Sequence, residues 1–143
     1  MKFIWRCLFL ILSLLFLSIS CSDDSSDSFL LGDWNVVRIS SGNELFDSAD
    51  EEAVTITFVT NVNFSGMTNA NTFSGNYTLN GTILEINAFV TTEAAEAGFG
   101  AQFFAALESG RQEESNTIEF TFEINDNRLI LESASSILTL ERI

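Results

Sequence analysis

Apolar and polar residues alternate along most of the chain after Phe29, as they do in strands with one buried face. Residues 54–58 (VTITF) place their apolar side chains on one side and threonines on the other, and residues 118–124 (IEFTFEI) repeat the pattern with glutamates. A period of two predicts half-buried antiparallel strands. About eight strands are predicted, at residues 33–40, 53–59, 61–66, 71–79, 82–88, 116–124, 127–133 and 136–142.

Turn-forming residues separate these strands. Asn80-Gly81 lies between the fourth and fifth strands and predicts a two-residue type I′ turn, in which both central residues have positive φ. Asn125-Asp126-Asn127 and the serine-rich residues 133–136 join the later strands. The pattern is therefore that of successive hairpins.

One segment, residues 91–110 (TTEAAEAGFGAQFFAALESG), predicts a helix inserted between the fifth and sixth strands. Phe99, Phe103 and Leu107 are spaced four apart and form one apolar stripe, which we expect to face the core.

The ends of this helix have capping residues in the sequence. Thr91 or Thr92 is expected to cap its start, and Gly110 is expected to end it. Two glycines in the middle weaken the helix, so that two short helices remain an alternative.

Residues 1–20 have the layout of a secretory signal peptide, with two basic residues, a short apolar run and small residues before Cys21. The apolar run is shorter than the roughly 20 residues that a spanning helix needs. Its end resembles a bacterial lipobox, whose cysteine is acylated and becomes the first mature residue. Ser20 fits that pattern, whereas Ser18 stands where leucine is usual. An uncleaved anchor and an ordinary signal peptide are the alternatives.

Residues 21–28 (CSDDSSDS) predict a solvated tether between the lipid on Cys21 and a folded domain at residues 29–143. Ser22 occupies the position where an aspartate can signal retention in the inner membrane. The resemblance to lipoproteins therefore implies a protein that is lipid-anchored to the outer membrane, on the periplasmic side or at the cell surface.

The segment from Cys21 onward is strongly acidic, with four arginines, no lysine and twenty carboxylates, a side-chain balance of −16. Such a chain lacks the basic surface that nucleic-acid binding requires. It has no histidine, and Cys21 is its only cysteine, which excludes Ser-His-Asp and Cys-His catalysis and zinc sites of these residues. We therefore expect no enzymatic activity, no cofactor and no metal.

The remaining catalytic option is a pair of carboxylates acting on glycans. Glu119 and Glu123, however, are expected on the outward face of their strand, where charges are solvated. A calcium site in the acidic loop after the first strand would lack the spaced ligand pattern of a dedicated site.

That loop, residues 40–52, is longer than a hairpin requires and is the candidate contact surface. The residues proposed to contact a partner are Phe46, Asp47, Asp50, Glu51 and Glu52. If Phe46 is a contact residue, its replacement by alanine should weaken partner binding and leave stability nearly unchanged.

Three stretches resemble the META domain known from heat-shock lipoproteins of the HslJ type. They are FSGMTNANTFSGNYTLNGTILEI, which carries the family's Gly…Asn-x-Phe-x-Gly-x-Tyr run, the helical segment of residues 91–110, and the closing NRLILESASSILTLERI. The resemblance implies a mainly β fold, a small antiparallel lipocalin-like β-barrel or roll with an inserted helix. It implies no established enzymatic activity and an association with envelope stress tolerance.

Two details bear on this resemblance. Gly32-Asp33-Trp34 looks like the Gly-x-Trp of lipocalin-type barrels, although a buried tryptophan at the start of a strand is the simpler interpretation. Many META domains carry a cysteine before the Asn-x-Phe and another ahead of the helix. Here Ala70 stands at the first position and the second also lacks a cysteine, so that no link between them is available.

These observations predict a non-catalytic envelope lipoprotein that acts as a binding or stress-protection module through an unidentified protein partner. The alternative is a lipocalin-like carrier of a small apolar ligand, because eight strands can enclose one small molecule. The many phenylalanines favour a filled interior instead.

Overall fold

The computed structural model describes residues 29–49 and 52–143, so the signal peptide, Cys21 and the tether predicted for residues 1–28 lie outside the described residues. Nine strands and one helix occur in the described part. The strands are β1 (Gly32–Ser41), β2 (Glu44–Asp47), β3 (Val54–Thr60), β4 (Asn63–Met67), β5 (Thr72–Asn80), β6 (Ile83–Thr91), β7 (Ile118–Asn125), β8 (Arg128–Glu132) and β9 (Ser136–Arg142). All except β2 match strands predicted from the sequence.

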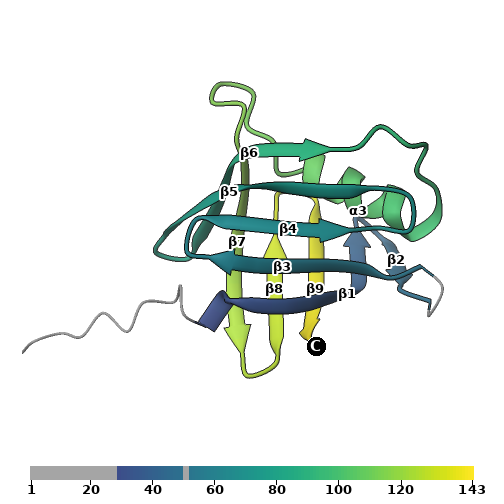
Figure 1. Cartoon of the computed structure of the whole chain (residues 1–143), viewed down its shortest axis with the longest axis horizontal. Helices are drawn as coiled ribbons and strands as arrows, with labels where there is room; N and C mark the ends of the chain where they lie inside the picture. Colours follow the sequence, from purple (N-terminus) through teal and green to yellow (C-terminus); the bar gives the residue numbers. More distant parts are fainter. Residues whose placement is uncertain (1–28, 50–51) are drawn as a thin grey trace, which may run out of the picture.

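Strand β1 closes the sheet into a barrel, because it pairs with β3 along one edge and with β9 along the other. The remaining strands follow in sequence order, each antiparallel to the next, which confirms the predicted mainly β, eight-stranded antiparallel barrel. Figure 1 shows β3 to β6 crossing in front of β7 to β9, with the helix at one end. We call this the helix end, and the end where β1 begins and β9 finishes the N-terminal end.

Strand β2 corrects the prediction of an open loop over residues 40–52. It pairs with Arg38–Ser41, the part of β1 that extends beyond the pairing with β3. Gly42 has a φ of +58°, and its N–H donates to Ser135 O at 3.2 Å, so the turn is tied to the neighbouring β8–β9 connection. With only four residues, β2 is too short to show a clear alternation in the sequence.

Side chains from all eight barrel strands fill the interior. Trp34, Tyr77, Phe103 and Phe120 are among the fully buried residues. The other buried apolar residues are Leu30, Val36, Ile39, Val54, Ile56, Phe58, Phe64, Phe73, Leu84, Ile86, Phe99, Ala106, Leu107, Ile118, Leu129, Leu131, Leu138 and Leu140. Burial of this apolar area is the main stabilising contribution to the fold.

The helix α3 (Gly98–Glu108) covers the helix end of the barrel (Figure 1). Its stripe of Phe99, Phe103 and Leu107 is buried, which confirms that this face belongs to the core. The ring of Phe103 lies 5.3 Å, between centroids, from that of Phe73 on β5.

The predicted start of the helix is wrong. Strand β6 runs to Thr91, residues 92–97 have no regular secondary structure, and Ala97 precedes the first helical residue. The N–H of Phe99 is satisfied from another segment, because it donates to Glu52 Oε2 at 3.1 Å. A carboxylate at the positive end of the helix dipole is favourable, and it replaces the threonine cap expected locally.

The β5–β6 turn also differs in type from the prediction. Asn80 pairs with Ile83, so the two turn residues are Gly81 and Thr82. Only Gly81 has positive φ, at +62°. This is the arrangement of a type II′ turn, in which glycine occupies the first central position.

Strands β6 and β7 pair over a short stretch only. Ile83–Ile86 pairs with Ile118–Thr121, whereas the rest of β6 pairs with β5 alone. Figure 1 shows the edge of this outer part of β6 at the top of the barrel, beside the loop that leads from α3 to β7. We call residues 87–91 of β6 and the adjoining gap in pairing the open seam.

The stability of a Phe46 variant tests whether residues 44–47 are part of the packed domain, as strand β2, and not a free loop. Phe46 is half-buried and packs against the core, so Phe46→Ala should lower the free energy of unfolding by about 1–2 kcal/mol, less than for a fully buried phenylalanine. Leu45, which is 65% exposed on the same strand, is the matched control, and Leu45→Ala should cost less than about 0.5 kcal/mol. Urea unfolding of both variants measures this difference. Equal, negligible losses would return Phe46 to the role of a free contact residue.

Candidate functional site

Arg142 and Trp34 close the N-terminal end of the barrel. The indole Nε1 of Trp34 donates to Leu30 O at 2.8 Å, and the Arg142 guanidinium carbon lies 4.2 Å from the centre of the indole ring. Arg142 also donates from Nη1 to Leu31 O at 2.7 Å and from Nη2 to Phe29 O. The last strand of the barrel therefore holds the first described residues in place.

Gly32 makes this arrangement possible. Its φ is +118°, which side chains rarely tolerate, and a Cβ at this position would lie 2.8 Å from Arg142 Nη1. The Gly-x-Trp noticed in the sequence is thus a local packing unit with Arg142. The sequence contained the arginine but gave no signal that it stacks on Trp34.

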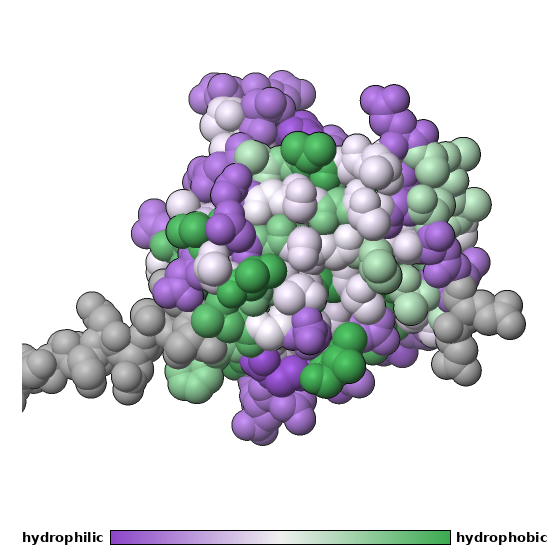
Figure 2. All heavy atoms as spheres, viewed as in Figure 1, coloured by the Kyte–Doolittle hydropathy of each residue, from purple (hydrophilic) through white to green (hydrophobic). Residues whose placement is uncertain are grey.

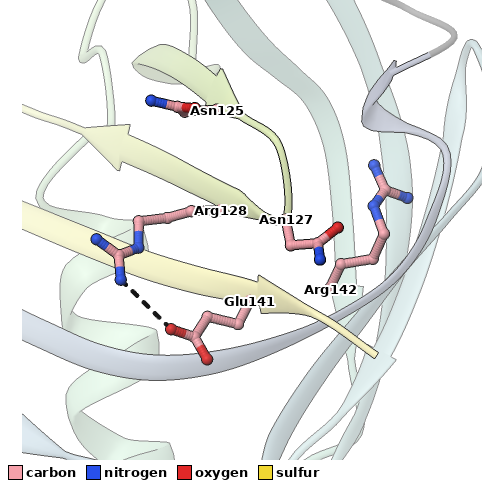
Figure 3. Close-up of a pocket in the computed structure, with 5 residues that line it drawn as sticks. All are labelled: Asn125, Asn127, Arg128, Glu141 and Arg142. Atoms are coloured by element: carbon pink, nitrogen blue, oxygen red, sulfur yellow. Dashed lines mark ion pairs between the residues drawn. The ribbon is translucent and has the colours of Figure 1, made fainter.

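An open pocket of about 510 Å³ lies beside this unit (Figure 3). It is lined by Asn125, Asn127, Arg128, Glu141 and Arg142. Arg128 Nη2 lies 3.5 Å from Glu141 Oε1, whereas the Arg142 side chain points away from this pair. Among the described residues, no carboxylate lies within ion-pair distance of Arg142, whose hydrogen bonds go to main-chain carbonyls.

A second pocket, of about 350 Å³, continues along the outer wall of β1, β8 and β9 and shares Arg128 and Glu141 with the first. Here Arg38 Nε donates to Asp47 Oδ1 at 2.6 Å, and this hydrogen bond raises the pKa of Arg38. Three of the four arginines after Cys21 thus lie on this wall or at its N-terminal end.

A polar cluster around the buried Thr68 and Asn71 joins the β4–β5 loop to the segment ahead of α3. Asn71 donates from Nδ2 to Ala94 O at 2.9 Å and to Glu96 Oε2 at 2.8 Å. Its Oδ1 accepts from Thr92 Oγ1 and from the N–H of Ala94, both at 2.9 Å. Thr68 Oγ1 also donates to Glu96 Oε2. These bonds connect the two places where many META domains carry cysteines.

The other residues of the Asn-x-Phe-x-Gly-x-Tyr run are structural too. Phe73 is buried in the aromatic core, and Tyr77 is fully buried with its hydroxyl donating to Thr60 O at 2.8 Å. A Cβ on Gly75 would lie 2.1 Å from Ala88 O, so only glycine fits between these strands. The residues of this motif therefore pack the core and hold neighbouring segments of the chain together.

The three predicted contact residues that the structure describes have different neighbours. Phe46 turns toward the core, Asp47 pairs with Arg38 on the outer wall, and Glu52 accepts the N–H of Phe99. Asp50 and Glu51 lie outside the described residues. Contact of Phe46 with a partner stays a prediction.

A metal site made of carboxylates would need several acidic side chains to converge within the described ranges. No group of three or more histidine, cysteine, aspartate or glutamate side chains is arranged there to hold a metal ion. Glu108 is instead paired with Arg111, 2.6 Å apart, and this hydrogen bond lowers the pKa of Glu108.

Comparison with known proteins decides the family. The model of the META domain matches residues 27–141. The chain belongs to the META-domain family. No curated protein sequence matches it.

Solved structures share the barrel. A protein from Burkholderia xenovorans, solved by NMR, has 19% sequence identity and a TM-score of 0.61, and the match covers 82% of this chain and 86% of that one. A lipocalin-like protein from Bacteroides uniformis has 19% identity and a TM-score of 0.55, over 80% and 98% of the two chains. A DUF4847 family protein from Bacteroides vulgatus has 15% identity and a TM-score of 0.56, over 79% and 93%. At these identities the likeness shows the fold alone, and it confirms the lipocalin-like barrel of this META domain.

The polar cluster predicts the effect of removing Asn71. Asn71→Ala would leave the N–H and C=O of Ala94 without their side-chain partner, and should lower the free energy of unfolding by about 2–3 kcal/mol. Asn76, exposed on the following strand β5 and bonded to Asn63, is the matched control. Asn76→Ala should cost under about 0.5 kcal/mol in the same denaturant titration. Similar small losses in both variants would show that the cluster does not hold the two segments together.

Proposed function

We propose that this META-domain protein is a non-catalytic lipoprotein of the cell envelope, whose domain is a binding or stress-protection module that acts through its surface. The observation that carries the proposal is the filled barrel, whose interior is occupied by apolar side chains from the strands and from the buried face of α3. Binding is then left to the exterior. The same filling disfavours the alternative of a carrier for a small apolar ligand.

Anchoring through a lipid on Cys21 is supported by the sequence around that residue and by the short distance to the domain. Residues 22–28 span at most about 25 Å when extended. The bonds from Arg142 then fix the chain at Phe29 and Leu31. A lipid on Cys21 would therefore keep the N-terminal end of the barrel near the bilayer.

The distribution of exposed groups agrees with this orientation. Phe29 and Val62, which are 60% and 51% exposed, lie at the N-terminal end together with Arg128 and Arg142. Acidic side chains at the helix end are Glu52, Glu93, Glu96 and Glu108. The N-terminal end carries Asp33, Asp126 and Glu141 beside its two arginines, so the exposed apolar residues are the main support for this orientation.

Among the described residues, no helix is both long enough and apolar enough to cross a bilayer. We propose the outer membrane as the location, on its periplasmic side or at the cell surface, and a role in envelope stress tolerance like that of the HslJ type. Both rest on the lipobox-like sequence, on Ser22 and on the META resemblance.

Replacement of the proposed lipidation site tests the anchor. Cys21→Ala should release the protein from the membrane fraction and abolish the added lipid mass on the mature chain. The matched control is Cys7→Ala, because Cys7 lies within the predicted signal peptide and should have no effect on either readout. Membrane fractionation and intact mass spectrometry measure both. An unlipidated wild type, or a Cys21→Ala protein that stays membrane-bound, would contradict the proposal.

A further inference from the structure

The open seam exposes unpaired main-chain groups of β6. Thr92 N–H donates to Thr72 O at 3.0 Å. In an antiparallel pair, the main-chain groups of successive residues point alternately toward the partner strand and away from it, so this bond determines which residues of β6 face β5. It directs the N–H and C=O groups of Phe89 and Thr91 away from β5. Among the described residues, no hydrogen bond to these main-chain groups is recorded on that side.

This edge lacks charge and proline, two of the devices that usually protect a free strand, although a bulge at Asn87 stands at its start. Residues 87–91 (NAFVT) contain no charged residue and no proline, and Val90 is 68% exposed. Figure 2 shows hydrophobic atoms at the upper edge, where Figure 1 places β6. An edge of this kind accepts an added strand readily.

The side of the seam that faces the core supplies an apolar contact. Phe89 and Phe104 are both half-buried, and their ring centroids lie 6.2 Å apart in an edge-to-face arrangement. A strand added beside β6 would place every second side chain against these rings. Apolar side chains at those positions would complete their burial.

Carboxylates border the seam at both ends. Glu85 and Glu119 stand directly opposite each other where β6 and β7 part, and no cation is paired with either among the described residues. Like charges in register are unfavourable. Glu93 follows the other end of β6. Lysine or arginine side chains on an added strand would relieve this repulsion.

We propose that the open seam binds an extended, basic polypeptide segment of a protein partner by β-augmentation, with apolar residues alternating with lysine or arginine. This proposal states which class of protein the binding module would recognise, and it rests on the function proposed above. A second copy of the chain fits less well, because each copy is strongly acidic and would bring a second set of these glutamates to the seam.

The experiment uses the full-length protein in detergent micelles and a synthetic peptide that alternates valine and lysine. A peptide of equal length that alternates valine and glutamate is the ligand control. The variant is Thr91→Pro, which removes an outward N–H and leaves the main-chain hydrogen bonds to β5 in place. It also removes the bond from Thr91 Oγ1 to Thr72 O at 3.3 Å, a bond that the alanine control loses as well. Its matched control is Thr91→Ala, which keeps that N–H.

We expect the valine-lysine peptide to bind, with weaker affinity as salt rises, and the valine-glutamate peptide not to bind. Thr91→Pro should weaken binding about tenfold, the effect of about one hydrogen bond, whereas Thr91→Ala should stay within about twofold of wild type. In wild type, the amide resonances of Phe89 and Thr91 should shift on binding. This readout stands even if Thr91→Pro fails to fold.

Several results would overturn the inference. The basic peptide could fail to bind at low salt, or the acidic peptide could bind equally well. The amide resonances that shift on binding could belong only to residues far from β6. The protein could also associate with itself through the seam. None of them bears on the Cys21 fractionation test. Failure of the anchor and failure of the seam can therefore be told apart.

Discussion

The pairing of β1 with β9 is the constraint on which the rest of the structure depends. It joins the first and last strands of the barrel, from Trp34 opposite Arg142 to Ser41 opposite Ser136. Arg142 strengthens this closure by stacking on Trp34 and by bonding to the main chain before β1. Because β1 also pairs with β3, the two walls of the barrel are held at a fixed distance, and the interior must be filled by side chains of matching volume.

Aromatic residues meet that requirement at the helix end. Phe73 contacts Phe89 on β6 and Phe103 and Phe104 on α3, with ring centroids 5.3–6.0 Å apart. The helix is therefore part of the core, and the polar cluster around Asn71 sets where its preceding segment runs. A barrel closed in this way leaves its outer wall and its strand edges for recognition, which is why the proposed function lies on the surface.

The sequence was sufficient for features that repeat locally. Alternation over residues 54–58 and 118–124 predicted strands, and the spacing of Phe99, Phe103 and Leu107 predicted the buried face of the helix. Features that depend on distant partners were missed. Glu52 caps a helix that begins 46 positions later, at Gly98, and the stacking of Arg142 on Trp34 joins opposite ends of the chain. For the candidate site, the acidic residues near Phe46 were recognised from the sequence. Their partners, Arg38 for Asp47 and the N–H of Phe99 for Glu52, could not be read from positions along the chain.

At the open seam, part of β6 pairs with a strand on one side only, and the account of the binding surface depends on this free edge. Native-state hydrogen exchange of the unliganded protein tests it most directly. The amides of Ala88 and Val90, which face β5, should be strongly protected, and those of Phe89 and Thr91 should exchange close to the rate of free amides. Protection of all four amides would contradict the account, because it would show that the seam is closed in solution.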